Sequence, residues 1–95
     1  MMMKVQIPVE AGNEAIRTKQ LPGIIEASMA QLKPEASYFF AEGGVRTALF
    51  FFDLADPSQI PVVAEPFFMG ANAAVSMVPV MNPEELQAGL GQLSR

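Results

Sequence analysis

The sequence predicts an α+β domain in which helices cover one face of a four-stranded antiparallel sheet. Segments with strand-like and helix-like periodicity follow one another in the order strand, helix, strand, strand, helix, strand, helix. A Gly43-Gly44 pair separates the second and third strand-like segments, as in a tight hairpin turn. The chain has 95 residues, which fits one domain spanning residues 1–95.

The first strand and the first helix are predicted from a change of periodicity. Residues 3–9 alternate apolar and polar side chains with a period of two, which is typical of a strand. Gly12 and Asn13 then break this alternation, and Asn13 is suited to cap a helix over residues 14–20. The predicted connection between strand and helix is therefore a short loop.

A second helical piece and a hairpin follow. Apolar residues recur at three- and four-residue spacing over residues 22–32, and Pro34 prevents the helix from continuing. The aromatic segment 36–42 is predicted as the second strand, and residues 45–54 as the third.

The last part of the chain contains two helix-start signals. Asp56 and Pro57 predict a short helix, which we expect to end by Glu65 because Pro66 lacks a backbone donor. Residues 73–81 are apolar on both faces and are predicted as strand four. Asn82-Pro83-Glu84-Glu85 then predicts a final helix through Leu86, Leu90 and Leu93, which should fray unless it is packed.

The third strand is apolar on both of its faces. One face carries Val45, Leu49 and Phe51, and the other Ala48, Phe50, Phe52 and Leu54. Helices can cover one face in so short a chain, so the other face needs a second copy or a ligand. Which of the two faces meets the helices stays open. If Phe50 and Phe52 lie on the uncovered face, they form the dimer interface, and Phe52→Asp yields monomeric or insoluble protein.

Composition supports association and excludes several chemistries. Hydrophobic residues make up 51% of the chain and charged residues 17%, below the roughly 25% of an ordinary soluble domain. The net charge is −4 without a basic patch, so we expect no nucleic-acid partner. Cysteine and histidine are absent, which removes disulfides, thiolate nucleophiles and the commonest metal and haem ligands. We expect no cofactor, no metal, no membrane span and no signal peptide, hence a cytoplasmic protein.

The candidate site residues are polar and aromatic side chains in or beside the strands, and no catalytic residue is assigned. Arg46 follows the Gly-Gly turn, where such a residue is most often a solvated hairpin end or an ion-pair partner, here of Glu42; it could also anchor a ligand. Tyr38 could position a substrate or bury its ring, and Asp53 is best explained by turn chemistry. The ligand-binding candidates are Tyr38, Arg46, Phe50, Phe52, Phe67, Phe68 and Asn72; for the phenylalanines among them, core or dimer interface is the favoured alternative.

The element order is that of a ferredoxin-like βαββαβ fold with an extra C-terminal helix. Together with the segments 54–57, 67–70 and 78–81, it resembles the dimeric α+β-barrel superfamily, which includes muconolactone isomerases and antibiotic-biosynthesis-type monooxygenases. The resemblance implies two sheets packed face to face in a homodimer. Histidine-based chemistry of that superfamily cannot be carried over to a chain without histidine. Only Asn72 could echo the Asn, Trp and His residues of its cofactor-free monooxygenases.

Three functions are compatible with these observations. The chain could be a homodimeric binder of a small apolar molecule or an accessory module. It could be a cofactor-independent isomerase or monooxygenase acting on an aromatic or apolar substrate, or an adaptor that pairs an edge strand with another protein. An enclosed cavity with Tyr38 or Arg46 pointing into it would favour the enzyme over a pure assembly module.

Overall fold

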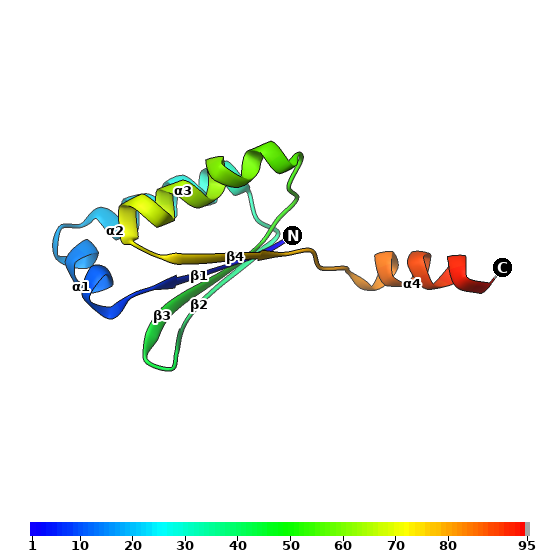
Figure 1. Cartoon of the computed structure of the whole chain (residues 1–95), viewed down its shortest axis with the longest axis horizontal. Coiled ribbons are helices and arrows are strands. Elements are labelled where there is room, and N and C mark those ends of the chain that lie inside the picture. The colour runs from blue at the N-terminus through cyan, green and yellow to red at the C-terminus, as the bar shows by residue number, and fades with distance from the viewer. Residues whose placement is uncertain (95) are drawn as a thin grey trace.

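A computed structural model describes residues 1–94 as one four-stranded antiparallel sheet with helices on one side (Figure 1). Strands β1 (Met2–Ile7) and β3 (Val45–Phe51) lie in the centre, and β2 (Ala36–Glu42) and β4 (Ala74–Val78) at the edges. The sheet order is β2-β3-β1-β4, and all three pairings are antiparallel. The predicted α+β class is confirmed, and the arrangement is compatible with a ferredoxin-like fold.

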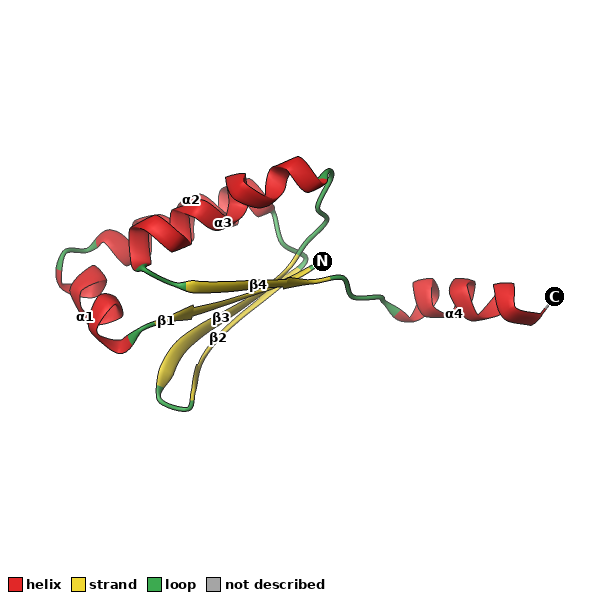
Figure 2. Ribbon diagram, viewed as in Figure 1, coloured by secondary structure: helices red, strands yellow, loops and turns green. Residues whose placement is uncertain are grey.

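The helices fall into two groups. Helices α1 (Val9–Arg17), α2 (Gln20–Leu32) and α3 (Ile60–Ala71) lie on the same side of the sheet (Figure 2). Helix α4 (Pro83–Gly91) projects beyond the end of the sheet. Two 3₁₀ turns complete the described chain, one ahead of α3 and one after α4, over Pro57–Gln59 and Gln92–Ser94.

The β2–β3 hairpin matches its prediction closely. Strand β2 covers the predicted residues 36–42, and Gly43 and Gly44 have φ angles of 60° and 80°. Positive φ at both turn residues suits the right-handed twist of the flanking strands, and glycine adopts it without strain. Strands β1, β3 and β4 are each shorter than the apolar segments that predicted them.

The predicted start of α1 is wrong. The helix begins at Val9, directly after Pro8, and runs through Gly12 and Asn13. Gly12 is buried because the helix lies close to the sheet there. A Cβ atom at this position would lie 2.6 Å from Arg46 Nη1 and 3.2 Å from Ile7 Cγ2. Gly12 is therefore a site of close approach, not a helix break.

The predicted end of α3 is also wrong, because the helix continues through Pro66 to Ala71. Proline removes one backbone donor from a helix, and burial of the turns on either side outweighs that loss here. Phe67 is 1% exposed, and Val63 and Ala71 are buried with it. The packed face of α3 therefore sets its length.

The predicted helix caps at Asp56 and Asn82 are both present. Asp56 Oδ1 accepts a hydrogen bond of 2.9 Å from the Ser58 N–H, and hydrogen bonds from Ser58 lower the pKa of the Asp56 carboxyl group. Asn82 and Glu85 form a complete capping box at the start of α4.

The core lies between the sheet and α1, α2 and α3. Met3 and Val5 of β1 and Phe50 of β3 have no exposed surface, and the rings of Phe50 and Phe67 lie 5.9 Å apart. Phe52, just after β3, is 3% exposed on the same side. Of the two alternatives left open for Phe50 and Phe52, core or interface, the core alternative is confirmed, because both side chains are buried within one chain.

The opposite side of the sheet has no helix over it (Figure 1). Strand alternation and register place Val45, Leu49 and Phe51 of β3 on this side. Tyr38 and Phe40 of β2 are 59% and 42% exposed there. We call this surface the bare face; it comprises Met2, Lys4, Gln6, Ala36, Tyr38, Phe40, Glu42, Val45, Thr47, Leu49, Phe51, Ala74, Ser76 and Val78.

Candidate functional site

An open pocket of about 350 Å³ lies between the β2–β3 hairpin and helices α2 and α3. This volume is near the lower end of the range for small-molecule sites, roughly 300–1,000 Å³. Its walls are almost entirely apolar, and Arg46 is the charged residue among them. The lining residues are Val5, Ile7, Leu21, Ile25, Phe39, Phe40, Ala41, Arg46, Thr47, Ala48 and Phe67.

The pocket forms because small side chains lie next to large ones on the hairpin. Ala48 pairs with Phe39 across β2 and β3, and Ala41 pairs with Arg46. The alanines leave space that Leu21 of α2 and Phe67 of α3 border but do not fill. The Phe39 ring is braced edge-to-face against Phe50, with ring centroids 5.8 Å apart.

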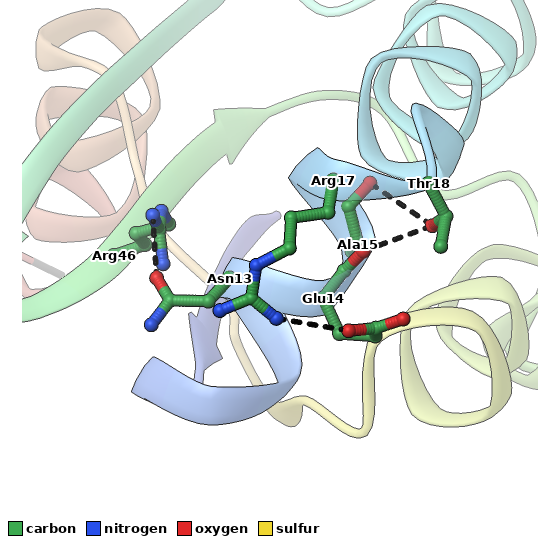
Figure 3. A network of polar contacts seen from close by, with 6 residues as sticks. All are labelled: Asn13, Glu14, Ala15, Arg17, Thr18 and Arg46. Carbon is green, nitrogen blue, oxygen red and sulfur yellow. Dashed lines mark hydrogen bonds and ion pairs between the residues drawn. The ribbon is translucent and has the colours of Figure 1, made fainter.

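Arg46 is the only charged residue in the lining, and α1 holds its side chain in place. Arg46 Nη2 donates a hydrogen bond of 3.1 Å to Asn13 Oδ1 (Figure 3). A guanidinium group carries five N–H donors in a fixed geometry, so this bond leaves others for a ligand. The close approach at Gly12 confines the same side chain from the α1 side. Arg46 is thus a positioned cation at one end of an apolar pocket.

The alternative pairing of Arg46 with Glu42 is wrong. Glu42 Oε2 lies 2.6 Å from Lys4 Nζ on the bare face. The other ion pair within residues 1–94 joins Arg17 to Glu14 on the outer surface of α1. No described carboxylate forms an ion pair with Arg46. Its charge therefore remains available to an anionic group in the pocket.

The residues predicted for ligand binding do not form one cluster. Arg46 and Phe67 line the pocket, whereas Phe50 lies buried beside it. Phe52 borders a separate cavity of about 240 Å³ near Asp53. Tyr38 lies on the bare face, with its ring against Phe51. Phe68 is 41% exposed on α3, and Asn72 is the left-handed C-cap of that helix.

The sequence predicted Arg46 and Phe67 as ligand-binding residues but not the rest of the lining; Phe39, together with Asn13 beside the lining, illustrates why. Phe39 could have been found, because a two-residue turn at Gly43-Gly44 fixes the hairpin register and sets Phe39 opposite Ala48. Asn13 could not have been found, because its hydrogen bond to Arg46 depends on how α1 packs against β3, which no local sequence pattern encodes.

No protein-family model, curated protein or solved structure matches this chain. Within residues 1–94, no helix is both long enough and apolar enough to cross a membrane. The same residues contain no cluster of three carboxylate side chains arranged to hold a metal ion.

Proposed function

We propose that this protein is a homodimeric binder of a small apolar molecule that carries an anionic group. The observation that supports this most strongly is the apolar pocket with Arg46 at one end. An apolar cavity supplies affinity through burial, and a few placed polar groups orient the ligand. A carboxylate is the natural partner of a guanidinium because its two oxygens match two parallel N–H donors.

Binding is favoured over catalysis by the chemistry of the lining. The one charged side chain of the lining is an arginine, a residue type that does not act as a general base in proteins. The Thr47 side chain lies on the bare face, and its Oγ1 donates a hydrogen bond of 3.0 Å to the Val45 carbonyl. Tyr38, a candidate for positioning a substrate in an isomerase or oxygenase, lies on the other side of the sheet. The pocket can therefore hold and orient a molecule, but it offers no proton-transfer group among its lining residues.

The homodimer is supported by the bare face. Tyr38 and Phe40 expose large aromatic surfaces next to Leu49 and Phe51 on β3. Leaving such side chains in water forgoes roughly 1.5–3 kcal/mol for each one that could be fully buried. A second copy that presents the same surface across a twofold axis would bury both sets at once.

We expect Arg46→Met to weaken binding of the apolar anion 1-anilinonaphthalene-8-sulfonate about tenfold, since a lost charge-assisted hydrogen bond is worth roughly 1.5 kcal/mol at a partly exposed site. Methionine keeps most of the apolar stem and removes the charge. Fluorescence titration measures the dissociation constants. Arg17→Met, which removes an exposed guanidinium from α1, is the control and should bind as the wild type does. Equal affinity in the Arg46→Met and wild-type proteins would contradict the assigned anchor.

A further inference from the structure

Residues 79–94, which we call the arm, extend away from the rest of the chain (Figure 1). The radius of gyration is 15.5 Å, against roughly 12 Å for a compact domain of this length. The apolar residues Leu86, Leu90 and Leu93 follow one another at helical spacing and are 45%, 54% and 79% exposed. The arm thus carries an apolar stripe that its own chain does not cover.

The sequence specifies the start of α4 strongly but gives the helix little stability of its own. The Asn82 side chain accepts a hydrogen bond of 2.8 Å from the Glu85 N–H, and Glu85 Oε1 accepts one of 3.0 Å from the Asn82 N–H. Yet α4 has 9 residues, fewer than the roughly 12–15 that an isolated helix needs in water. Gly89 and Gly91 lower its helix propensity further. Such a helix needs a surface to pack against.

The amount of exposed surface fits a missing subunit. The accessible surface of the chain is 6413 Å², whereas a compact monomer of this mass exposes roughly 5,300 Å². The excess of about 1,100 Å² compares with the roughly 800 Å² that each partner buries in a standard interface. An interface of standard size with a second copy would therefore be large enough to bury the excess exposed surface of the bare face and the arm.

We infer that the arm of each subunit packs over the hairpin end of the partner's bare face. This inference rests on the proposed homodimer. A twofold axis that runs across the strands would reverse the partner's strand direction and set each arm at the partner's Gly43-Gly44 end. There the exposed rings of Tyr38 and Phe40 offer an apolar surface to the leucine stripe.

Charge favours this arrangement over one in which both arms lie side by side. The charged residues of the arm are Glu84 and Glu85, and Glu35 and Asp53 lie at the end of the sheet from which it departs. These four carboxylates outnumber the cations nearby, Lys33 and the Met1 amino group. If the two arms lay side by side, the carboxylates of one subunit would lie close to those of the other. At the hairpin end the carboxylate of Glu42 is paired with Lys4, so an acidic arm meets less repulsion there.

A cysteine pair tests the position of the arm in a chain that has no cysteine of its own. The variant Phe40→Cys/Leu90→Cys is oxidised and run on a non-reducing gel, and the linked peptides are identified by mass spectrometry. We expect a disulfide-linked dimer that joins positions 40 and 90 of different subunits. Leu90→Cys alone tests for adjacent arms, and Ala27→Cys/Leu90→Cys tests for docking on the groove between α2 and α3. Cross-linking in either control in preference to the 40–90 pair, or in none of the variants, would overturn the inference.

A matched pair of charge substitutions tests whether the leucine stripe contributes to association. Leu90→Glu should weaken dimerisation at least tenfold, whereas Ala88→Glu should not change it, because residue 88 lies two positions from residue 90 on the other side of α4. Sedimentation velocity measures both. Equal dissociation constants for the two variants would contradict docking through the stripe. A protein that still binds the naphthalene sulfonate but gives no 40–90 cross-link would contradict the inferred position of the arm and leave the pocket assignment intact. Loss of that binding with the cross-link intact would overturn the pocket assignment instead.

Discussion

Phe52→Asp is expected to unfold the protein. Phe52 is 3% exposed and packs in the core beneath the helices. Truncating a buried phenylalanine costs about 3–5 kcal/mol, and a carboxylate without a partner in apolar surroundings adds to that cost. A domain of this size has a free energy of unfolding of roughly 5–14 kcal/mol in total. The substitution therefore removes a large part of the stability of the subunit itself.

Thermal unfolding followed by circular dichroism measures this effect. Phe68→Asp is the matched control, because Phe68 is 41% exposed on α3, and its free energy of unfolding should change by about 1 kcal/mol or less. If Phe52→Asp unfolds cooperatively at the wild-type temperature, Phe52 is not a core residue and the assignment of faces is wrong.

Leu49→Asp is expected to give a folded monomer. Leu49 lies in the middle of the bare face, between Lys4 on β1 and Tyr38 on β2. Within one chain the new carboxylate can reach Lys4 and water, so the fold should tolerate it. In a face-to-face dimer two such carboxylates would be buried near the twofold axis, which should weaken association by roughly 2 kcal/mol or more, about 30-fold.

Sedimentation velocity and circular dichroism together separate these effects. Ile16→Asp makes a similar change on the outer surface of α1, where the side chain is 49% exposed, and it should leave association unchanged. Two outcomes argue against the proposed interface: a Leu49→Asp protein as strongly dimeric as the wild type, or an equal loss of association in both variants.

Local signals in the sequence predicted most of the elements. The Gly43-Gly44 turn fixed the hairpin, and the capping residues Asp56 and Asn82 marked the helix starts correctly. The predictions at Gly12 and Pro66 were wrong because both residues were interpreted as helix breaks from their low helix propensity alone. Tertiary packing decided both positions: Gly12 permits a close helix–sheet contact, and burial of Phe67 carries α3 past the proline.

The site was predicted less completely than the fold. Arg46 was selected as a charged residue at a hairpin end, and it lines the pocket. Tyr38 was selected for its chemistry, yet it lies on the opposite side of the sheet. Alternation along a strand separates residues into two faces but does not say which face meets the helices. That choice depends on long-range packing of Phe50 against Phe67, which is absent from any local pattern.

We propose above all that the bare face is covered by a second copy of the chain. Sedimentation equilibrium of the wild-type protein at micromolar concentration tests it most directly. The proposed homodimer has twice the subunit mass of 10.2 kDa, so we expect about 20 kDa. A single species at 10.2 kDa across the concentration range would contradict the claim.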